Sequence, residues 1–149
     1  MPDKDTLQRV ARDRKQGKRA STQAGEFVRQ EMHHIREGKH GAKSTKQAIA
    51  IGLSEARRAG VKLAPPKKGQ TSEKTRASAK RAVKAGKHKE SHPSRRRSRA
   101  TTNALRREGH SAASHRALSR QAHGAARKRS AASRSAAARK AAATRRSRA

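Results

Sequence analysis

Apolar side chains recur every three or four residues in three segments near the N-terminus, the spacing of one face of an α-helix. The segments cover residues 3–16, 21–37 and 44–59, and each is followed directly by a glycine. Glycine is favoured just past a helix end. We therefore predict three short helices. The first segment places Leu7, Val10 and Ala11, with Arg14, at helical intervals. The apolar stripes of the other two are Ala24, Val28, Met32 and Ile35, and Ile49, Gly52, Leu53 and Ala56.

The third segment has the clearest start signal. Ser44 and Gln47 have the spacing of a capping box, in which a serine and a glutamine satisfy free N–H groups at a helix start. A strand over residues 48–53 is an alternative, because large and small residues alternate there. The helical continuation over residues 54–58 favours the helix. Small residues at 48, 52 and 56 would let a second helix or a protein partner approach closely.

Five glycines recur at intervals of 21 to 26 residues: Gly17, Gly38, Gly60, Gly86 and Gly109. Each follows a helix-like stretch with Arg or Lys in its last turn, where a cation complements the helix dipole. The pattern indicates an array of short helical units. The alternative is that a chain rich in Ala, Gly, Lys and Ser produces such spacings by chance.

Apolar and basic residues divide the chain near Pro65 and Pro66. Residues 67–149 contain only three large apolar residues, together with 26 Lys or Arg against three Asp or Glu. Ordering such a segment costs about 1–2 kcal/mol per residue, with little apolar burial to offset it. We predict an all-α fold with a helical module at 1–66, a basic linker at 67–98 and a cationic tail at 99–149.

The linker and tail are expected to be largely disordered. Weak helical segments are predicted over residues 72–85 and 98–108, whereas residues 92–99 are predicted to be irregular. Beyond Ser111, charge repulsion is expected to prevent helix formation until phosphates neutralise the chain, although Ala and Arg are good helix formers.

The net charge of +31 on 149 residues indicates a polyanionic partner, most commonly nucleic acid. Neutralising about eight phosphates of duplex DNA would give a log–log salt dependence of affinity with a slope of about −7. The predicted nucleic-acid-binding residues are Lys43, Lys46, Arg57, Arg58, Lys62, Arg95, Arg96, Arg97, Arg99, Arg127, Lys128, Arg129, Arg145, Arg146 and Arg148.

Aromatic residues that could stack on unpaired bases are nearly absent. Phe27 is the only aromatic residue, and we expect it in the core. Binding should therefore address the backbone and shape of the nucleic acid, which favours duplex DNA or structured RNA over unpaired strands. Of these two partners we expect DNA rather than RNA. A sequence-reading helix-turn-helix is an alternative, with Lys43, Ser44, Lys46 and Gln47 at the start of its recognition helix.

Other functional classes have little support. His33, His34 and His40 accompany Glu31 and Glu37, but neighbouring histidines on a helix point in different directions, so we predict no metal site. No catalytic set or nucleotide-binding loop is present, and we predict neither enzymatic activity nor a cofactor. The chain has no cysteine, no signal-peptide pattern and no long apolar run. We expect a soluble protein of the cytoplasm, associated with the nucleoid and not with a membrane.

Several segments together resemble a known family. They are STQAGEFVR (21–29), HIREGKHGAKSTKQAIAIGLS (34–54) and ARRAGVKL (56–63), followed more loosely by SRATTNAL (98–105) and SAASH (111–115). This combination is similar to a family of small basic bacterial proteins of uncharacterised function, some of them labelled plasmid stabilisation protein. The tail resembles histone-H1-like tails in composition. The resemblance implies no catalytic or binding residue.

The sequence thus predicts a sequence-tolerant binder of duplex DNA, associated with the nucleoid or a plasmid. One alternative is a structural protein that binds a protein partner, or a second copy of itself, through the helical module. Another is a factor that binds the ribosome or structured RNA.

Overall fold

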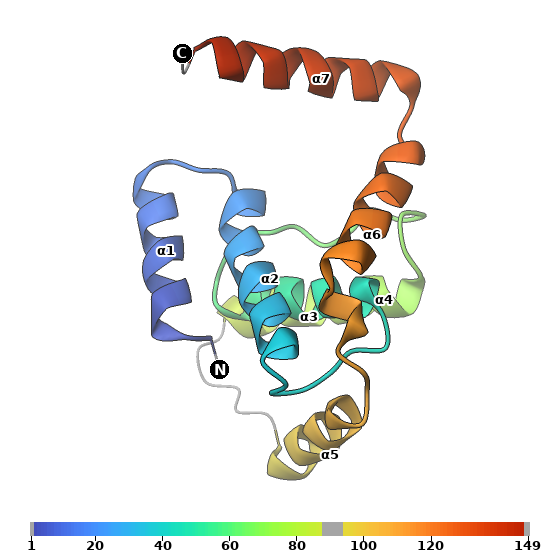
Figure 1. The fold of residues 1–149 in the computed structure, drawn as a ribbon. Coiled ribbons are helices and arrows are strands. Elements are labelled where there is room, and N and C mark those ends of the chain that lie inside the picture. The colour runs from blue at the N-terminus through green and yellow to red at the C-terminus, as the bar shows by residue number, and fades with distance from the viewer. Residues whose placement is uncertain (1, 88–93, 148–149) are drawn as a thin grey trace. The chain divides into compact units, whose positions relative to one another are not determined.

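The computed structural model describes residues 2–87 and 94–147, and these residues form helices and the segments that connect them, among them a long connection over residues 59–72 (Figure 1). The chain divides into two compact units, Met1–Ser114 and His115–Ala149. The first contains α1 (Lys4–Lys15), α2 (Ala20–Arg36), α3 (Thr45–Arg58), α4 (Glu73–Lys87), α5 (Arg95–Arg106) and the 3-10 turn η1 (Ser111–Ala113). The second contains α6 (His115–Arg127) and α7 (Ala131–Arg146).

The helices α1, α2 and α3 form over the three segments that show helical periodicity. The Ser44 hydroxyl accepts a hydrogen bond from the Gln47 N–H, as a capping box requires. In turn, the Lys43 N–H, one residue before the cap, donates a hydrogen bond to Oε1 of the Gln47 side chain. Residues 48–53 are helical, so the strand alternative is excluded.

Phe27 lies at the centre of the first unit and is fully buried. It belongs to a cluster with Val10, Ala24, Ala56 and Val61, which come from α1, α2, α3 and the segment after α3. The expectation that Phe27 is a core residue is confirmed.

The close approach of α2 and α3 depends on Gly52. A Cβ atom at this position would lie 2.7 Å from the Val28 Cα, closer than real Cβ contacts allow. Ala48 and Ala56 are fully buried on the same stripe. The small residues predicted to admit a neighbour therefore pack inside the module and are not available to a partner.

Three of the five recurring glycines end helices. Gly17, Gly38 and Gly60 have positive φ angles of 65°, 75° and 85° just past α1, α2 and α3. Gly86 instead lies within α4, where an added Cβ would be 2.1 Å from the Arg57 carbonyl oxygen. Gly109 also lacks a positive φ. The repeated unit, a helix ended by a glycine of positive φ, is therefore found at α1, α2 and α3. Gly86 instead allows α4 to pack closely on α3.

The predicted disorder of the basic linker and tail is wrong. α4 packs on α3 through a face on which Ala79 and Ala82 are buried. The prediction of disorder rests on large apolar residues as the only core formers. In the structure, alanines and Gly86 let the backbones of α3 and α4 come into contact, and burying these small residues costs little side-chain entropy. Residues 95–99, predicted to be irregular, form the first turns of α5. Residues 88–93 of the predicted linker lie outside the described residues.

Two similar connections hold the remainder of the first unit together. Residues 36–44 read REGKHGAKS and residues 107–114 read REGHSAAS. The N–H groups of Gly41 and Ala42 donate to the carbonyl oxygens of Leu105 and Gly109, at 2.9 and 3.1 Å. The connection after α2 is thereby fixed to the end of α5. Further bonds join Arg36 Nε to the Ala113 carbonyl oxygen and the Thr45 hydroxyl to the Ala112 carbonyl oxygen.

The second unit is also helical, which corrects the expectation for residues beyond Ser111. α7 has no buried residue, and the Ser130 hydroxyl caps its start by accepting from the Ser133 N–H. Ala and Arg have high intrinsic helix propensities, and in these helices that preference outweighs charge repulsion. The boundary of the helical module at residue 66 stays a prediction.

Candidate nucleic-acid interface

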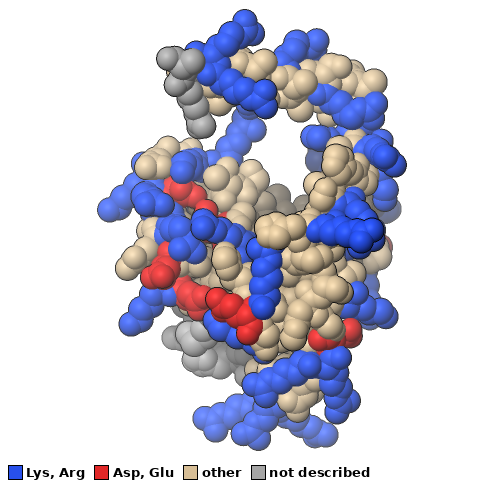
Figure 2. Space-filling model, in the orientation of Figure 1, with Lys and Arg blue, Asp and Glu red and all other residues tan. Residues whose placement is uncertain are grey.

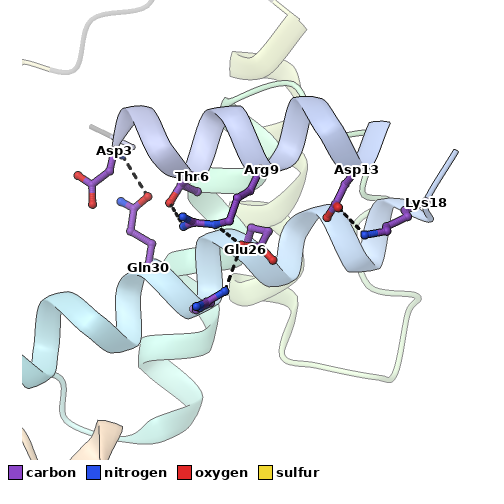
Figure 3. A network of polar contacts seen from close by, with 8 residues as sticks. Asp3, Thr6, Arg9, Asp13, Lys18, Glu26 and Gln30 are labelled. Carbon is purple, nitrogen blue, oxygen red and sulfur yellow. Dashed lines mark hydrogen bonds and ion pairs between the residues drawn. The ribbon is translucent and has the colours of Figure 1, made fainter. Parts of the chain in front are cut away.

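Acidic residues concentrate on α1 and α2, where they form ion pairs. Figure 3 shows the Arg9 guanidinium between the Thr6 hydroxyl and the Glu26 carboxylate, with an Arg9–Glu26 distance of 2.6 Å. Lys18 binds the buried Asp13 carboxylate at 2.7 Å. The Asp3 N–H donates to Gln30 across the two helices. The Asp13 and Glu26 carboxylates are therefore paired with cations within the fold.

Cations elsewhere lack this compensation. Within residues 2–87 and 94–147, the one ion pair beyond residue 40 joins Arg76 to Glu73, at 3.3 Å. Figure 2 shows acidic side chains mainly over α1 and α2, and a cluster of Lys and Arg over α5. Cations are exposed on α1 and α2 as well, but there they lie among acidic residues, whereas those of α5 have no acidic residue on the same helix.

The predicted residues around α3 divide into exposed and buried groups. Lys43, Lys46, Arg58 and Lys62 are exposed. Arg57 is buried, and its guanidinium donates to the carbonyl oxygens of Leu53, Leu63 and Ala64 at 3.3–3.4 Å. Burial also lowers the pKa of the Arg57 guanidinium. Arg57 therefore holds the segment after α3 and offers no free N–H face to a phosphate.

The start of α3 is only partly free for a recognition helix. The Ser44 and Gln47 side chains are engaged in capping, and Thr45 is buried against the Ala112 carbonyl oxygen. Lys43 and Lys46 remain exposed there. This geometry offers charged side chains for phosphates and few groups for reading bases.

The predicted arginines of residues 95–99 lie together on α5. Arg95, Arg96, Arg97 and Arg99 are all exposed, and α5 contains no acidic residue and no buried residue. Arg95 and Arg99 are four positions apart and share one face of the helix. A short helix thus presents four guanidinium groups, each suited to bidentate phosphate binding.

Sequence reasoning missed the basic face of α4. The face opposite its buried alanines carries five exposed cations, spread over about 140° of the helix circumference. The signal was present in the sequence, since Ala79, Ala82 and Gly86 share one face and the cations share the other. The five cations are Lys74, Lys80, Arg81, Lys84 and Lys87.

In the second unit, α6 carries a basic stripe that sequence reasoning also missed. Arg116, Arg120, His123 and Arg127 are spaced four, three and four positions apart, so they share one face over about 16 Å of helix. The predicted residues Lys128 and Arg129 follow α6 and are exposed. Arg145 and Arg146 are exposed in the last turn of α7, and Arg148 lies outside the described residues.

Comparison with known proteins gives a partial match. Residues 3–68 match the profile of a family of unknown function (DUF6496). The match covers α1, α2 and α3 and stops before α4. The match agrees with the resemblance to an uncharacterised family, and the description of that family assigns no function. No curated protein and no solved structure matches the chain.

A search for membrane spans among the described helices found none with the length and apolar character needed to cross a bilayer.

Proposed function

We propose that this protein binds duplex DNA through its phosphate backbone, with little dependence on sequence. The observation that carries the proposal is the uneven distribution of acidic residues: most carboxylates and ion pairs lie on or next to α1 and α2, α4 has one ion pair beside its exposed cations, and α5, α6 and α7 present exposed cations with no acidic residue. Release of counterions from the phosphates would supply the free energy of binding.

The form of the cationic surfaces supports backbone binding over base reading. Cations stand on helices in rows, and Phe27, the one aromatic residue, is buried in the core. Unpaired bases would therefore find no stacking platform. Within a cell, such binding fits association with the nucleoid or a plasmid, the setting implied by the family resemblance.

A matched pair of triple variants tests the proposal. Lys80→Gln, Arg81→Gln and Lys84→Gln together remove three charges from the exposed face of α4. Lys4→Gln, Arg12→Gln and Lys15→Gln remove three exposed charges from α1, close to the acidic residues. Both variants have the same net charge, so a difference between them reports which face contacts phosphate.

We expect the α4 variant to reduce the magnitude of the log–log salt slope by about 2–3, and the α1 variant by less than about 1. Equal effects would show that only net charge matters, and an unchanged affinity in both variants would contradict the proposal. Competition with structured RNA at matched ionic strength decides whether RNA is the preferred polyanion.

A further inference from the structure

The side chain of Glu31 on α2 lies in the interior of the first unit, with 1% of the residue exposed. Its Oε1 atom has no hydrogen-bond partner among the described residues. Its Oε2 atom lies 3.6 Å from His40 Nε2. Burying a carboxylate with an unpartnered oxygen raises the free energy of the folded state, and a bound cation would offset this cost.

Two histidines lie beside this carboxylate. His34 is one turn further along α2, and His40 lies on the connection that follows the helix. One ligand atom from each of Glu31, His34 and His40 lies within 4.8 Å of the others. The sequence pattern concealed this group, because it pairs a helix face with a residue brought back by the turn at Gly38, whereas the adjacent His33 is exposed.

Hydrogen bonds orient both imidazole rings. His40 Nδ1 lies 3.1 Å from the Gly41 carbonyl oxygen, which can only accept, so Nδ1 carries the proton and Nε2 is left with its lone pair. His34 Nε2 lies 3.0 Å from Asp3 Oδ2 and donates to it, leaving Nδ1 free to coordinate. Metal-binding histidines characteristically make such outer bonds to a backbone carbonyl or a carboxylate.

Further negative charge surrounds the group. Glu55 on α3 has an unpartnered buried oxygen, Oε2. The Glu55 carboxylate lies close enough to Glu31 to repel its charge. A surface groove that His34 lines is also lined by Asp3, Asp5 and Glu37, and by Arg9, Arg29 and Lys39. In a chain of net charge +31, this balance of acidic and basic side chains repels a small cation less than an acid-free helix such as α5 does.

We propose that Glu31, His34 and His40 bind one divalent transition-metal ion, with Zn²⁺ the best chemical match. Two imidazoles and one carboxylate are a known ligand set for zinc, whereas Mg²⁺ and Ca²⁺ prefer oxygen ligands alone. The ion satisfies the unpartnered Glu31 oxygen. It also joins α2 to the connection whose Gly41 and Ala42 hold the end of α5.

The test uses the full-length chain without a histidine tag, freed of nucleic acid by nuclease and high salt and then treated with a chelator. Zn²⁺ binding is measured by calorimetry and Co²⁺ binding by its visible absorption, with Mg²⁺ as the negative control. We expect uptake of one ion per chain at micromolar metal, a higher Tm, and slower amide exchange at Gly41 and Ala42.

Three variants locate the site. Glu31→Gln keeps the side-chain shape and removes the charged ligand, and His40→Ala removes an imidazole. Each should weaken Zn²⁺ binding at least about tenfold, since even the loss of an outer partner costs this much. His33→Ala, an exposed neighbour on the same helix, is the matched control and should bind Zn²⁺ as the wild type does.

Circular dichroism of each variant establishes that it is folded before titration. Failure of the folded wild-type chain to take up Zn²⁺ or Co²⁺ would overturn the proposal. So would unchanged affinity in both Glu31→Gln and His40→Ala, or an equal loss in His33→Ala. Because all titrations are done without DNA, none of these results depends on the proposed DNA binding.

Discussion

Both units of the chain are helical, but different forces hold their helices. In Met1–Ser114, helices bury Phe27, Ile35 and a set of alanines, and acidic residues pair with nearby cations. In His115–Ala149, α6 and α7 have no buried residue, and the sequence of this unit contains no acid. The first unit is stabilised by packing, and the second depends on helix propensity and on whatever neutralises its charge.

The two units should therefore differ in how ligand binding affects their stability. A packed unit keeps its structure whether or not a ligand is present. A helix without tertiary contacts is marginal in water at this length, so a polyanion that neutralises its arginines should also stabilise it. The second unit is therefore the part of the chain where binding and helix stability are expected to be coupled.

The largest difference between the units should come from core truncation. Phe27→Ala removes a fully buried aromatic side chain and should lower the free energy of unfolding of the first unit by about 3–5 kcal/mol. Leu118→Ala, at a half-buried position of α6, should cost less than about 1 kcal/mol. Urea denaturation followed by circular dichroism measures both, and similar losses would contradict the contrast.

A pair of glycine substitutions should act with opposite signs. Gly52→Ala places a Cβ against the backbone of Val28 and should cost about 1–3 kcal/mol by overpacking. Gly124→Ala in α6 meets no atom within 4 Å and should stabilise that helix by about 0.5–1 kcal/mol. Thermal unfolding of the first variant and the helix content of the second are the measurements. Destabilisation by Gly124→Ala would reveal packing that the structure lacks.

Arginines in the two units should differ in what they affect. Arg57→Gln removes the buried guanidinium that donates to the carbonyl oxygens of Leu53, Leu63 and Ala64 and should destabilise the first unit by about 1–3 kcal/mol, with the salt slope of DNA binding unchanged. Arg116→Gln with Arg120→Gln should leave unfolding unchanged and reduce the slope by up to about 2. If Arg57→Gln alone lowered the slope, its assignment as a structural residue would be wrong.

The smallest effect concerns helix propensity in α7. Ala137→Gly, at an exposed position, should lower the local helix stability by about 0.5–1 kcal/mol. Circular dichroism of the free chain should show a loss of helix, and saturating duplex DNA should restore most of it. A loss that persists unchanged on DNA would argue against coupling between binding and helix formation.

The first three helices could be predicted because their sequence signals are local. Stripes of apolar residues, the Ser44 cap and the glycines after each helix act within a few residues of one another. The packing of the helix over residues 73–87 was missed because alanine was not counted as a core residue, and the helices beyond Ser111 were missed because charge repulsion was given more weight than helix propensity. Ala79 and Ala82 are buried only because Gly86 lets α4 approach α3.

For the candidate sites too, local sequence signals predict some features, and contacts between distant segments are missed. Exposure of Lys46 and Arg58 follows from their positions on a helix, whereas burial of Arg57 depends on carbonyl groups of the segment after α3. His40 meets Glu31 because the chain turns back at Gly38. Contacts made by chain reversal lie outside what a local pattern can predict.

The most direct test is the salt dependence of duplex binding by the full-length chain, freed of nucleic acid. We expect the logarithm of the binding constant to fall with the logarithm of salt concentration with a slope of about −7, and to be nearly equal for duplexes of unrelated sequence. A slope near zero, or no binding in dilute buffer, would contradict the claim that a polyanion neutralises the exposed cations of this protein.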